Sequence, residues 1–539
     1  MQVRCTPPLR KKWKGWKMPK YQWKRGVVQE TLPSSLNWWT SLILLFGIYY
    51  LLLNIILVSD ALYIYKRVAE KAYLFWGVGI WFFFRTSLTA FRITTAVEYL
   101  AFSFPRMRRE LETFPPYSTI AILYTGYAKS DVEVFNALTA VYKAAFRYGA
   151  TKTILVLAMS KNEKGEREFP LLEEIRRYMI NLAESEEEAG FYKGMVVRAF
   201  AQDGTGKRSA LVKAIRFVRK IGGADAYYMM DGDSIPQEDA FVRAIPFLQN
   251  YPDIGAVTLE NYSYTQGGGF YNLYSLLRFM RRRVDLAYAA TVLTGRGSFI
   301  RGNILEQEQS LLLLDAHFIQ WRGKEGIIRA LTGDDKTMVY LTWSQGYKTI
   351  FVPDVALYAM EEPLEEAGAK VVVRGLQKLG MHEYFAPFLS MLVQETRYTR
   401  NMQLVGKALW DVRPADLATT LKLLDQRFFF WAALVGPLSA IVASIAYHPV
   451  VFFFWVFTSL TIRVVVTLFQ GILYGYWHPM MPVVSFFNII QSVVKIFSYW
   501  NIGRARWSRD GGNLVGAYNW FTPSMHIAII LIILYMLLK

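Results

Sequence analysis

Cysteine is nearly absent from this sequence, which has Cys5 as its single thiol among 539 residues. One cysteine excludes an intramolecular disulfide framework and a zinc site built on several cysteines. Acidic residues are also scarce, with 43 Asp and Glu against 61 Lys and Arg, so the net charge is +18. Charged residues make up 19% of the chain and apolar residues 53%, which argues against a disordered or purely soluble protein. A basic and apolar chain is typical of a membrane protein that handles anions such as phosphates, lipid headgroups or acidic polymers.

Long apolar runs are missing from the middle of the chain, between residues 117 and 425, and lie on either side of it. The run from Ser41 to Val58 has eighteen residues without a charge, the minimum for a helix that spans a membrane. Further candidate spans are residues 72–91, 428–447, 450–477 and 523–538. The apolar segment 480–500 carries three polar side chains, so we expect an interfacial or re-entrant helix there. The sequence thus predicts an integral multi-pass membrane protein with five spans.

The basic N-terminal tail sets the expected orientation. Residues 1–29 hold nine basic residues and no acidic one. By the positive-inside rule this tail lies in the cytoplasm, and two spans return the chain there, so we expect the central domain on the cytoplasmic side of the inner membrane. A cleavable signal peptide is the competing interpretation, but the apolar run begins after residue 40 and lacks a small-x-small cleavage site. Trp residues among the basic ones favour a lipid bilayer over nucleic acid as the partner of the tail.

The central region alternates short β-rich runs with helical segments. The predicted strands are residues 119–124, 153–158, 196–201 and 226–230, and the clearest helices are 131–148 and 207–220. This order predicts an α/β domain with a mostly parallel sheet, whose ligand site lies at the carboxyl ends of the strands. The domain boundaries that we expect are 1–36 for the tail, 37–92 for two transmembrane helices, 93–116 for a linker, 117–365 for the α/β domain, 366–426 for amphipathic interface helices, and 427–539 for the transmembrane region with a loop at 501–519.

A pair of carboxylates, Asp231 and Asp233, follows the predicted strand 226–230. Two acidic side chains released from a buried strand by a glycine suit a hard cation such as Mg²⁺ or Mn²⁺. Taken alone, the same tripeptide is also explained as a turn or a cap. Upstream, the glycine loop of residues 203–206 opens the helix 207–220, where free backbone N–H groups together with Lys207 and Arg208 suit a diphosphate. This loop does not have the spacing of a P-loop.

Three further polar segments lie in apolar surroundings. Thr294-Gly-Arg-Gly-Ser298 contains Arg296, and Leu331-Thr-Gly-Asp-Asp-Lys336 opens a helical stretch with Asp334 and Asp335. An Asp at a helix start is most often a cap. A second acidic pair would also supply a carboxylate that deprotonates an attacking hydroxyl while a cation holds a leaving diphosphate. The third segment, Gln394-Glu-Thr-Arg-Tyr398, is explained equally by an interface helix with snorkelling arginines.

The order of these motifs resembles that of the processive family-2 glycosyltransferases, which include cellulose, hyaluronan, chitin and alginate synthases. The order is Asp-Gly-Asp, then Gly-Asp-Asp, then Gln-x-x-Arg-aromatic before a membrane cluster, and the resemblance covers about residues 117–520. The sequence is most similar to the catalytic subunits of alginate (mannuronan) synthases. The features that suggest this branch are Gly-Thr-Gly-Lys-Arg208, Leu-Thr-Gly-Asp-Asp-Lys336, Phe-Val-Pro-Asp354 with Glu361-Glu-Pro363, Thr-Gly-Arg296 and Leu-Asp-Gln-Arg427.

The resemblance implies a GT-A fold and a role for each matching residue. Asp231 and Asp233 would bind nucleotide and metal, and Asp335, beside Asp334, would be the general base. The other implied site residues are Tyr127 for the nucleotide base, Lys207, Arg208, Arg296, Gln394 and Arg397 for the diphosphate, Tyr398 for the acceptor, and Trp507 and Arg509 in a gating loop. Two departures stand out, because Tyr398 replaces the usual Trp and residues 157–161 lack the family's acidic residue.

The implied activity is that of an inverting, processive polysaccharide synthase that uses GDP-mannuronate and Mg²⁺ or Mn²⁺ and translocates polymannuronate. Arg85, Arg296 and Arg463 could accompany the carboxylates of such a polymer. The alternatives are a synthase of another β-glycan (mannan, glucan or hyaluronan-like) that uses a GDP- or UDP-sugar, a non-processive transferase that makes a lipid-linked sugar, and a membrane-anchored binding protein without catalysis. We expect separate cyclic di-GMP-binding regulatory and export subunits as partners.

Overall fold

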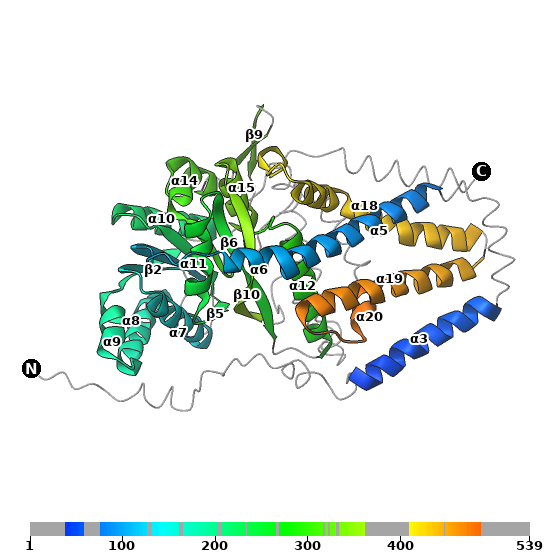
Figure 1. Ribbon diagram of the computed structural model, residues 1–539, viewed down its shortest axis with the longest axis horizontal. Coiled ribbons are helices and arrows are strands. Elements are labelled where there is room, and N and C mark those ends of the chain that lie inside the picture. The colour runs from blue at the N-terminus through cyan, green and yellow to red at the C-terminus, as the bar shows by residue number, and fades with distance from the viewer. Residues whose placement is uncertain are drawn as a thin grey trace, which may run out of the picture.

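The structure, a computed structural model, describes residues 38–58, 76–126, 131–160, 165–202, 207–232, 234–265, 269–315, 318–321, 324–329, 334–361, 409–446 and 448–486. These residues form an α/β domain and a group of long helices that extend from it (Figure 1). The predicted tail 1–36, most of the interface helices 366–426 and the loop 501–519 lie outside the described residues.

The α/β domain is built on one eight-stranded sheet with the order β3-β2-β1-β4-β7-β6-β10-β5. Its strands are β1 (Thr119–Gly126), β2 (Lys152–Ser160), β3 (Val196–Gln202), β4 (Ala226–Asp231), β5 (Ser234–Pro236), β6 (Ile254–Thr265), β7 (Ser298–Arg301) and β10 (Lys348–Glu361). Strands β3, β2, β1 and β4 are parallel, as are β6 and β10. The short strand β7 runs antiparallel to β4 and β6, and β5 runs antiparallel to β10. The predicted mostly parallel sheet is confirmed.

Helices cover both faces of this sheet. The helices of the domain are α7 (Asp131–Tyr148), α8 (Gly165–Leu182), α9 (Glu186–Gly194), α10 (Lys207–Lys220), α11 (Ala240–Asn250), α12 (Gly269–Tyr288), α13 (Gly302–Leu305), α14 (Glu308–Asp315) and α15 (Asp334–Ser344). A small hairpin, β8 (Phe318–Trp321) with β9 (Lys324–Arg329), lies beside them. Alternate residues of β1 enter different cores, because successive side chains of a strand point to opposite faces. Ile122 packs in one core with α7 and α11, and Leu123 packs in the other with α10 and α15.

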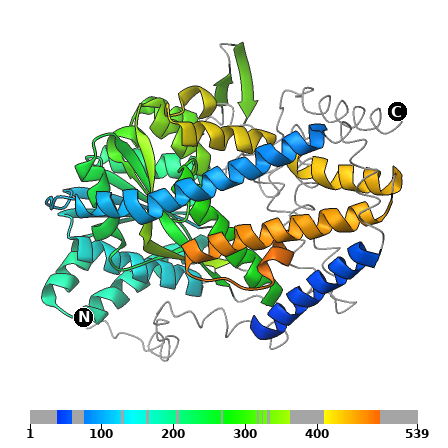
Figure 2. The ribbon, with the colours of Figure 1, turned by 45° about the vertical axis from the view of Figure 1, so that its right-hand side comes forward.

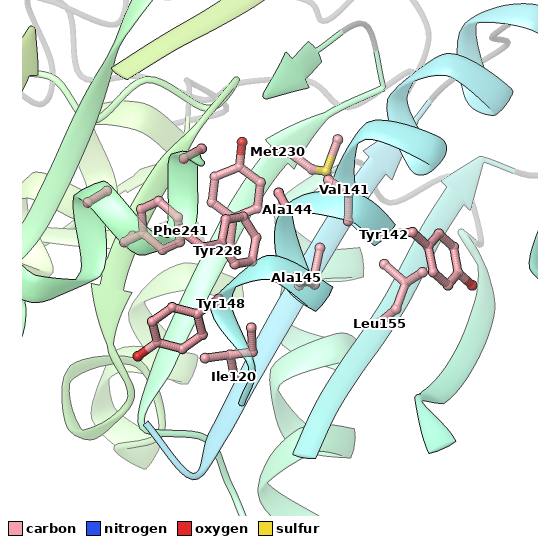
Figure 3. Packing of buried hydrophobic residues seen from close by; sticks show 14 of the residues in the cluster. Ile120, Val141, Tyr142, Ala144, Ala145, Tyr148, Leu155, Tyr228, Met230 and Phe241 are labelled. Carbon is pink, nitrogen blue, oxygen red and sulfur yellow. The ribbon is translucent and has the colours of Figure 1, made fainter. Parts of the chain in front are cut away.

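Aromatic side chains fill the first of these cores. The rings of Tyr228 on β4 and Phe241 on α11 lie 4.8 Å apart between centroids, and both are fully buried. Figure 3 shows them packed together near Tyr148 and Ile120. On the opposite face, Leu211, Ala214, Ile215 and Val218 of α10 are all buried, and the helix has the predicted bounds 207–220. The two packed faces fix the carboxyl ends of β1 and β4, where the polar motifs lie.

Four long helices leave the α/β domain and lie side by side in both views (Figures 1 and 2). They are α3 (Trp38–Val58), α5 (Trp76–Glu98), α18 (Leu417–Ala446) and α19 (Val450–Tyr474), and the short α20 (Met481–Phe486) follows. Among the described residues, α3 and α19 are the two helices that are long and apolar enough to cross a membrane. On α3, Ile43 is 71% exposed and Leu57 69% exposed. The expected five spans therefore stay a prediction, and the run 523–538 lies outside the described residues.

Helix α5 continues into the α/β domain through the π-helical turn η3 (Tyr99–Ser103) and helix α6 (Phe104–Arg109). The Tyr99 hydroxyl donates to the carbonyl of Phe351 on β10. Arg108 pairs with Asp354 at 2.5 Å, and Phe104 stacks on Phe247 with ring centroids 5.7 Å apart. These contacts anchor the end of α5 directly on the core of the domain.

A buried ion network joins α5 to α12 and α18. The carboxylate of Asp425 on α18 pairs with Arg85 and, at 3.2 Å, with Arg92, both on α5. Arg92 also pairs with Asp285 on α12, whose carboxylate lies 3.5 Å from the amine of Lys422 on α18. Arg85 was expected to accompany polymer carboxylates, but in the structure it has a protein carboxylate of its own.

The other intramembrane candidate, Arg463 on α19, donates to the hydroxyl of Ser485 at 3.0 Å and to its carbonyl. Arg281 of α12 donates to the same hydroxyl at 2.7 Å. Two guanidinium groups therefore converge on α20. A role of Arg463 toward an acidic polymer stays a prediction.

Candidate active site

Three acidic residues and one lysine from three elements meet at the carboxyl end of β4. Lys207 is the first residue of α10, Asp231 is the last residue of β4, and Asp334 and Asp335 open α15. The amine of Lys207 lies 2.5 Å from Asp231 Oδ1 and 2.6 Å from Asp334 Oδ2. The structure thus brings residues of the Gly-Lys and Asp-Gly-Asp motifs, 24 positions apart, together with the Gly-Asp-Asp motif, which lies more than a hundred residues further along the chain.

Lys207 is the positive centre of this cluster. Burial alone would lower its pKa, but the neighbouring carboxylates of Asp231, Asp334 and Asp335 raise the pKa above the usual lysine value. The side chain therefore carries its charge throughout the physiological range. A charged amine at the start of a helix, beside a glycine loop, suits the diphosphate that the sequence predicts here.

The two carboxylates of the Gly-Asp-Asp motif have different surroundings. Asp334 faces Lys207, whereas Asp335 Oδ1 accepts the backbone N–H of Gly295 at 3.0 Å. Burial raises the pKa of Asp335 to about 7, and the charge of Asp334 adds to this. A carboxylate with a pKa near neutrality is well matched to general-base work at physiological pH.

Gly295 makes a close approach that a side chain would block. A Cβ at this position would lie 2.6 Å from Asp335 Oδ1 and 3.0 Å from the amine of Lys207. Any other residue would therefore push the loop 289–297 away from the base. In this loop the sequence indicates a role only for Arg296, as a residue that binds the diphosphate. Arg296 follows Gly295 and is half-buried.

The chemistry of the donor set fits a divalent cation. The ammonium group of Lys207 lies between the carboxylates of Asp231 and Asp334, so these two acids already attract a positive charge. Carboxylate oxygens are the ligands that Mg²⁺ and Mn²⁺ prefer. Asp233 lies outside the described residues, and within the described ones no three acidic, His or Cys side chains are arranged to hold a metal unaided. An ion at Asp231 would need Asp233, water or phosphate oxygens to complete its coordination.

The remaining predicted site residues fall into two groups. Arg208 is described and buried, and its guanidinium donates to the carbonyl of Leu313 on α14 at 3.1 Å. This contact directs it toward α14, so its role in binding a diphosphate stays a prediction. The predicted residues that lie outside the described part of the chain are Tyr127, Asp233, Gln394, Arg397, Tyr398, Trp507 and Arg509.

Sequence reasoning assigned no role to the lysine that follows Asp334 and Asp335. Lys336 is 4% exposed, and its amine donates to Gln426 Oε1 at 3.0 Å. Burial lowers the pKa of Lys336 to about 7, and the positive charge of Lys422 adds to this. A buried lysine directly after a predicted base is a sequence signal that could have been read, because lysine is seldom buried without a reason.

Comparisons with known proteins agree with the geometry. A family model described as "Glycosyltransferase like family 2" matches residues 131–418. The chain is 25% identical to glycosyltransferase alg8 of Pseudomonas syringae pv. tomato over 82% of this chain and 85% of that protein. It is 27% identical to glycosyltransferase alg8 of Azotobacter vinelandii over 58% of this chain and 61% of that protein. A solved mannosyltransferase from Pyrobaculum calidifontis, in complex with GDP-Man and Mn²⁺, matches 76% of this chain and 98% of its own with 13% identity and a TM-score of 0.42.

Proposed function

Because the chain belongs to glycosyltransferase family 2, whose model matches just over half of it, we propose that it is a metal-dependent, inverting and processive polysaccharide synthase. The observation that carries this proposal is the cluster at the end of β4. There a charged Lys207 and a carboxylate with a pKa near 7, Asp335, lie close together around Gly295 and Asp334. The charged amine suits a departing diphosphate, and the Asp335 carboxylate suits an incoming hydroxyl.

In the proposed reaction, Asp335 takes the proton of an acceptor hydroxyl as its oxygen attacks the anomeric carbon of the donor sugar. The bond from that carbon to the diphosphate oxygen breaks on the far side, so the sugar is transferred with inversion and nucleoside diphosphate leaves. Lys207 and Asp231 lie where the diphosphate is expected. A divalent ion, held by Asp231 and Asp233, would neutralise the charge that develops on the leaving group.

In this reaction, Gly295 fixes the orientation of the base, Asp335. Its N–H directs Oδ1 of Asp335, and in the proposed reaction Oδ2 takes the hydroxyl proton. Orientation of this kind contributes to catalysis because a base that is misplaced by about 1 Å loses much of its effect. The two halves of the Gly-Asp-Asp motif therefore divide the work, with Asp334 holding Lys207 and Asp335 handling the proton.

The proposed location is the inner membrane, with several spans and the α/β domain in the cytoplasm. This is supported by the length and apolar character of α3 and α19 and by the exposed apolar side chains along α3. Such side chains, exposed on a long helix, need a cover that lipid provides. Helices α5 and α18, which pack against α19 and against α12 of the α/β domain, would accompany these spans.

The proposed donor is GDP-mannuronate and the proposed product is polymannuronate. Support comes from the alginate-synthase motifs in the sequence and from the relatives named alg8. Arg296 is a basic residue that directly follows Gly295, whose backbone N–H orients the proposed base. A uronate acceptor carries its carboxylate close to the hydroxyl that reacts, which suits a basic residue in this loop.

The test is to incubate the purified full-length protein with Mn²⁺ and a panel of UDP- and GDP-sugars. We expect release of GDP and a high-mass acidic polymer from GDP-mannuronate. A polymer from a neutral sugar would overturn the uronate assignment, and nucleotide release with only a short or lipid-linked product would overturn processivity. Absence of turnover with every donor would favour a binding protein and overturn the proposed enzyme.

The rate is expected to depend on pH through Asp335. The base must be ionised to accept a proton, and its pKa is raised to about 7 by burial and by Asp334. The turnover number should therefore fall below pH 7, by about tenfold for each pH unit once the base is mostly protonated. Initial rates of nucleotide release at saturating donor across a pH series would measure this. A rate that stays constant well below pH 6 would contradict the assignment.

A further inference from the structure

One motif of the sequence, Leu-Asp-Gln-Arg427, has no part in the function proposed so far. It lies near the start of α18, and its glutamine, Gln426, is half-buried. The amide of Gln426 makes two hydrogen bonds to the catalytic domain. Its Oε1 accepts from the amine of Lys336 at 3.0 Å, and its Nε2 donates to the hydroxyl of Thr291 at 3.3 Å.

The two partners of Gln426 belong to the two segments that orient Asp335. Lys336 follows Asp335 on α15. Thr291 is buried in the loop 289–297, which also contains Gly295, the donor to Asp335 Oδ1. The base, its backbone donor and the amide of Gln426 thus form a closed ring that passes through Lys336 on one side and Thr291 on the other.

The position of Gln426 is itself fixed from the long helices. Asp425, the preceding residue, pairs with Arg85 and Arg92 of α5. Lys422, one turn earlier on α18, donates to the backbone carbonyl of Asp285 on α12 at 3.0 Å. These contacts fix the start of α18 against α5 and α12. Through its two hydrogen bonds, Gln426 connects this part of α18 to the segments that orient Asp335.

We propose that Gln426 is a positioning residue for catalysis, which holds the loop 289–297 and helix α15 together so that Asp335 faces the acceptor. The inference rests on the function proposed above. An amide suits this role because it accepts from a cation and donates to a hydroxyl at the same time. Because Gln426 lies on α18, the activity of the proposed cytoplasmic site would also depend on how α18 packs among the proposed spans.

Several charged groups surround the base and set the background for a test by pH. Those that face Asp335 are Asp334 beside it, Lys207 from α10, Asp231 from β4, Arg282 from α12, and Lys336 with Lys422 of α18 behind it. Loss of the Gln426 amide leaves the first four in place. It removes the acceptor of the Lys336 amine and loosens the loop that supplies the Gly295 N–H. Both changes disfavour the ionised form of Asp335, so its pKa rises.

The first experiment compares three variants of the full-length protein. Gln426→Met keeps the volume and removes both hydrogen bonds, and we expect kcat to fall about tenfold to a hundredfold while the donor KM stays within about twofold. The acidic limb of the pH profile should move to higher pH. Gln426→Glu restores an acceptor for Lys336 and should recover most of kcat. Gln345→Met is the matched control, since this amide also makes several hydrogen bonds but lies beyond the far end of α15.

A double-mutant cycle keeps the test independent of one variant's folding. Thr291→Val removes the other end of the Nε2 contact and should lower kcat in the same way, and the double variant should be little worse than Gln426→Met alone. Unchanged kcat and pH profile in both single variants, or effects that multiply in the double one, would overturn the positioning role. A wild-type protein that releases no nucleotide would instead overturn the proposed function, and this inference with it.

Discussion

Replacement of Asp335 by Asn is expected to abolish polymer synthesis while the donor still binds. The amide keeps the shape of the side chain and can still accept the Gly295 N–H, which the structure places 3.0 Å from Oδ1. It cannot accept the proton of the acceptor hydroxyl. Because a positioned general base contributes about a hundred- to ten-thousandfold, we expect kcat to fall by that factor. Nucleotide release measures the rate, and calorimetric titration with the donor nucleotide measures binding.

Asp334→Asn provides the contrast for this prediction. Asp334 pairs with Lys207 at 2.6 Å and does not accept the Gly295 N–H, so its loss should disturb the diphosphate side of the site first. We expect a higher KM for the donor as the main effect of that variant. If Asp335→Asn kept the wild-type turnover, or if the two variants behaved alike, the division of roles within the motif would be wrong.

Replacement of Asp425 by Asn should cause the largest loss of stability among the substitutions considered. The Asp425 side chain is 8% exposed and lies between Arg85 and Arg92. Without its charge, two guanidinium groups face each other in a poorly hydrated space. Removal of one partner of a buried ion pair typically costs about 3–5 kcal/mol. Thermal unfolding in detergent, followed together with the yield of folded protein, would measure the change.

Two further variants test the cause of this loss. Asp253→Asn removes an acid from an exposed pair with Lys348, where both side chains are more than half exposed, and should cost about 0–1 kcal/mol. Replacing Asp425 and Arg85 together by Leu removes the unpaired charge as well, while Arg92 keeps its second partner Asp285. This double variant should be more stable than Asp425→Asn. Equal losses in all three would show that charge burial is not the reason.

Strands β1 to β4, one half of the sheet, were predictable from the sequence because their signals are local. The helices Asp131–Tyr148 and Lys207–Lys220 have the predicted bounds, and the strand that leads to Asp231 ends one residue later than expected. Strands β5, β6, β7 and β10 were not predicted. Strand β7 has four residues and lies between β4 and β6, antiparallel to both, after the long helix α12 has reversed the chain. Such a reversal depends on tertiary connections and leaves no periodic pattern in so short a segment.

The site was predictable where one residue type carries the chemistry. Asp231, Asp335 and Lys207 stand out as charged residues at the ends of predicted elements, and the structure brings them together. Gly295 acts through a backbone N–H, which every non-proline residue has, so its role appears only with the fold. Arg85 seemed to be available for a polymer, because its partner Asp425 lies 340 residues further along the chain.

Helices α5, η3 and α6 form one unbroken segment, which would connect the proposed membrane to the α/β domain. At about 1.5 Å per residue it is on the order of 50 Å long. Tyr99 and Arg108, in its C-terminal part, attach it to Phe351 and Asp354 of β10. A helix fixed at one end answers a change in bilayer thickness by tilting as a whole. In a thinner membrane, the same tilt would press on Asp425 and on the start of α18. With the proposed location, the rate of the proposed sugar transfer should therefore depend on bilayer thickness, and reconstitution in lipids of graded chain length would measure this dependence.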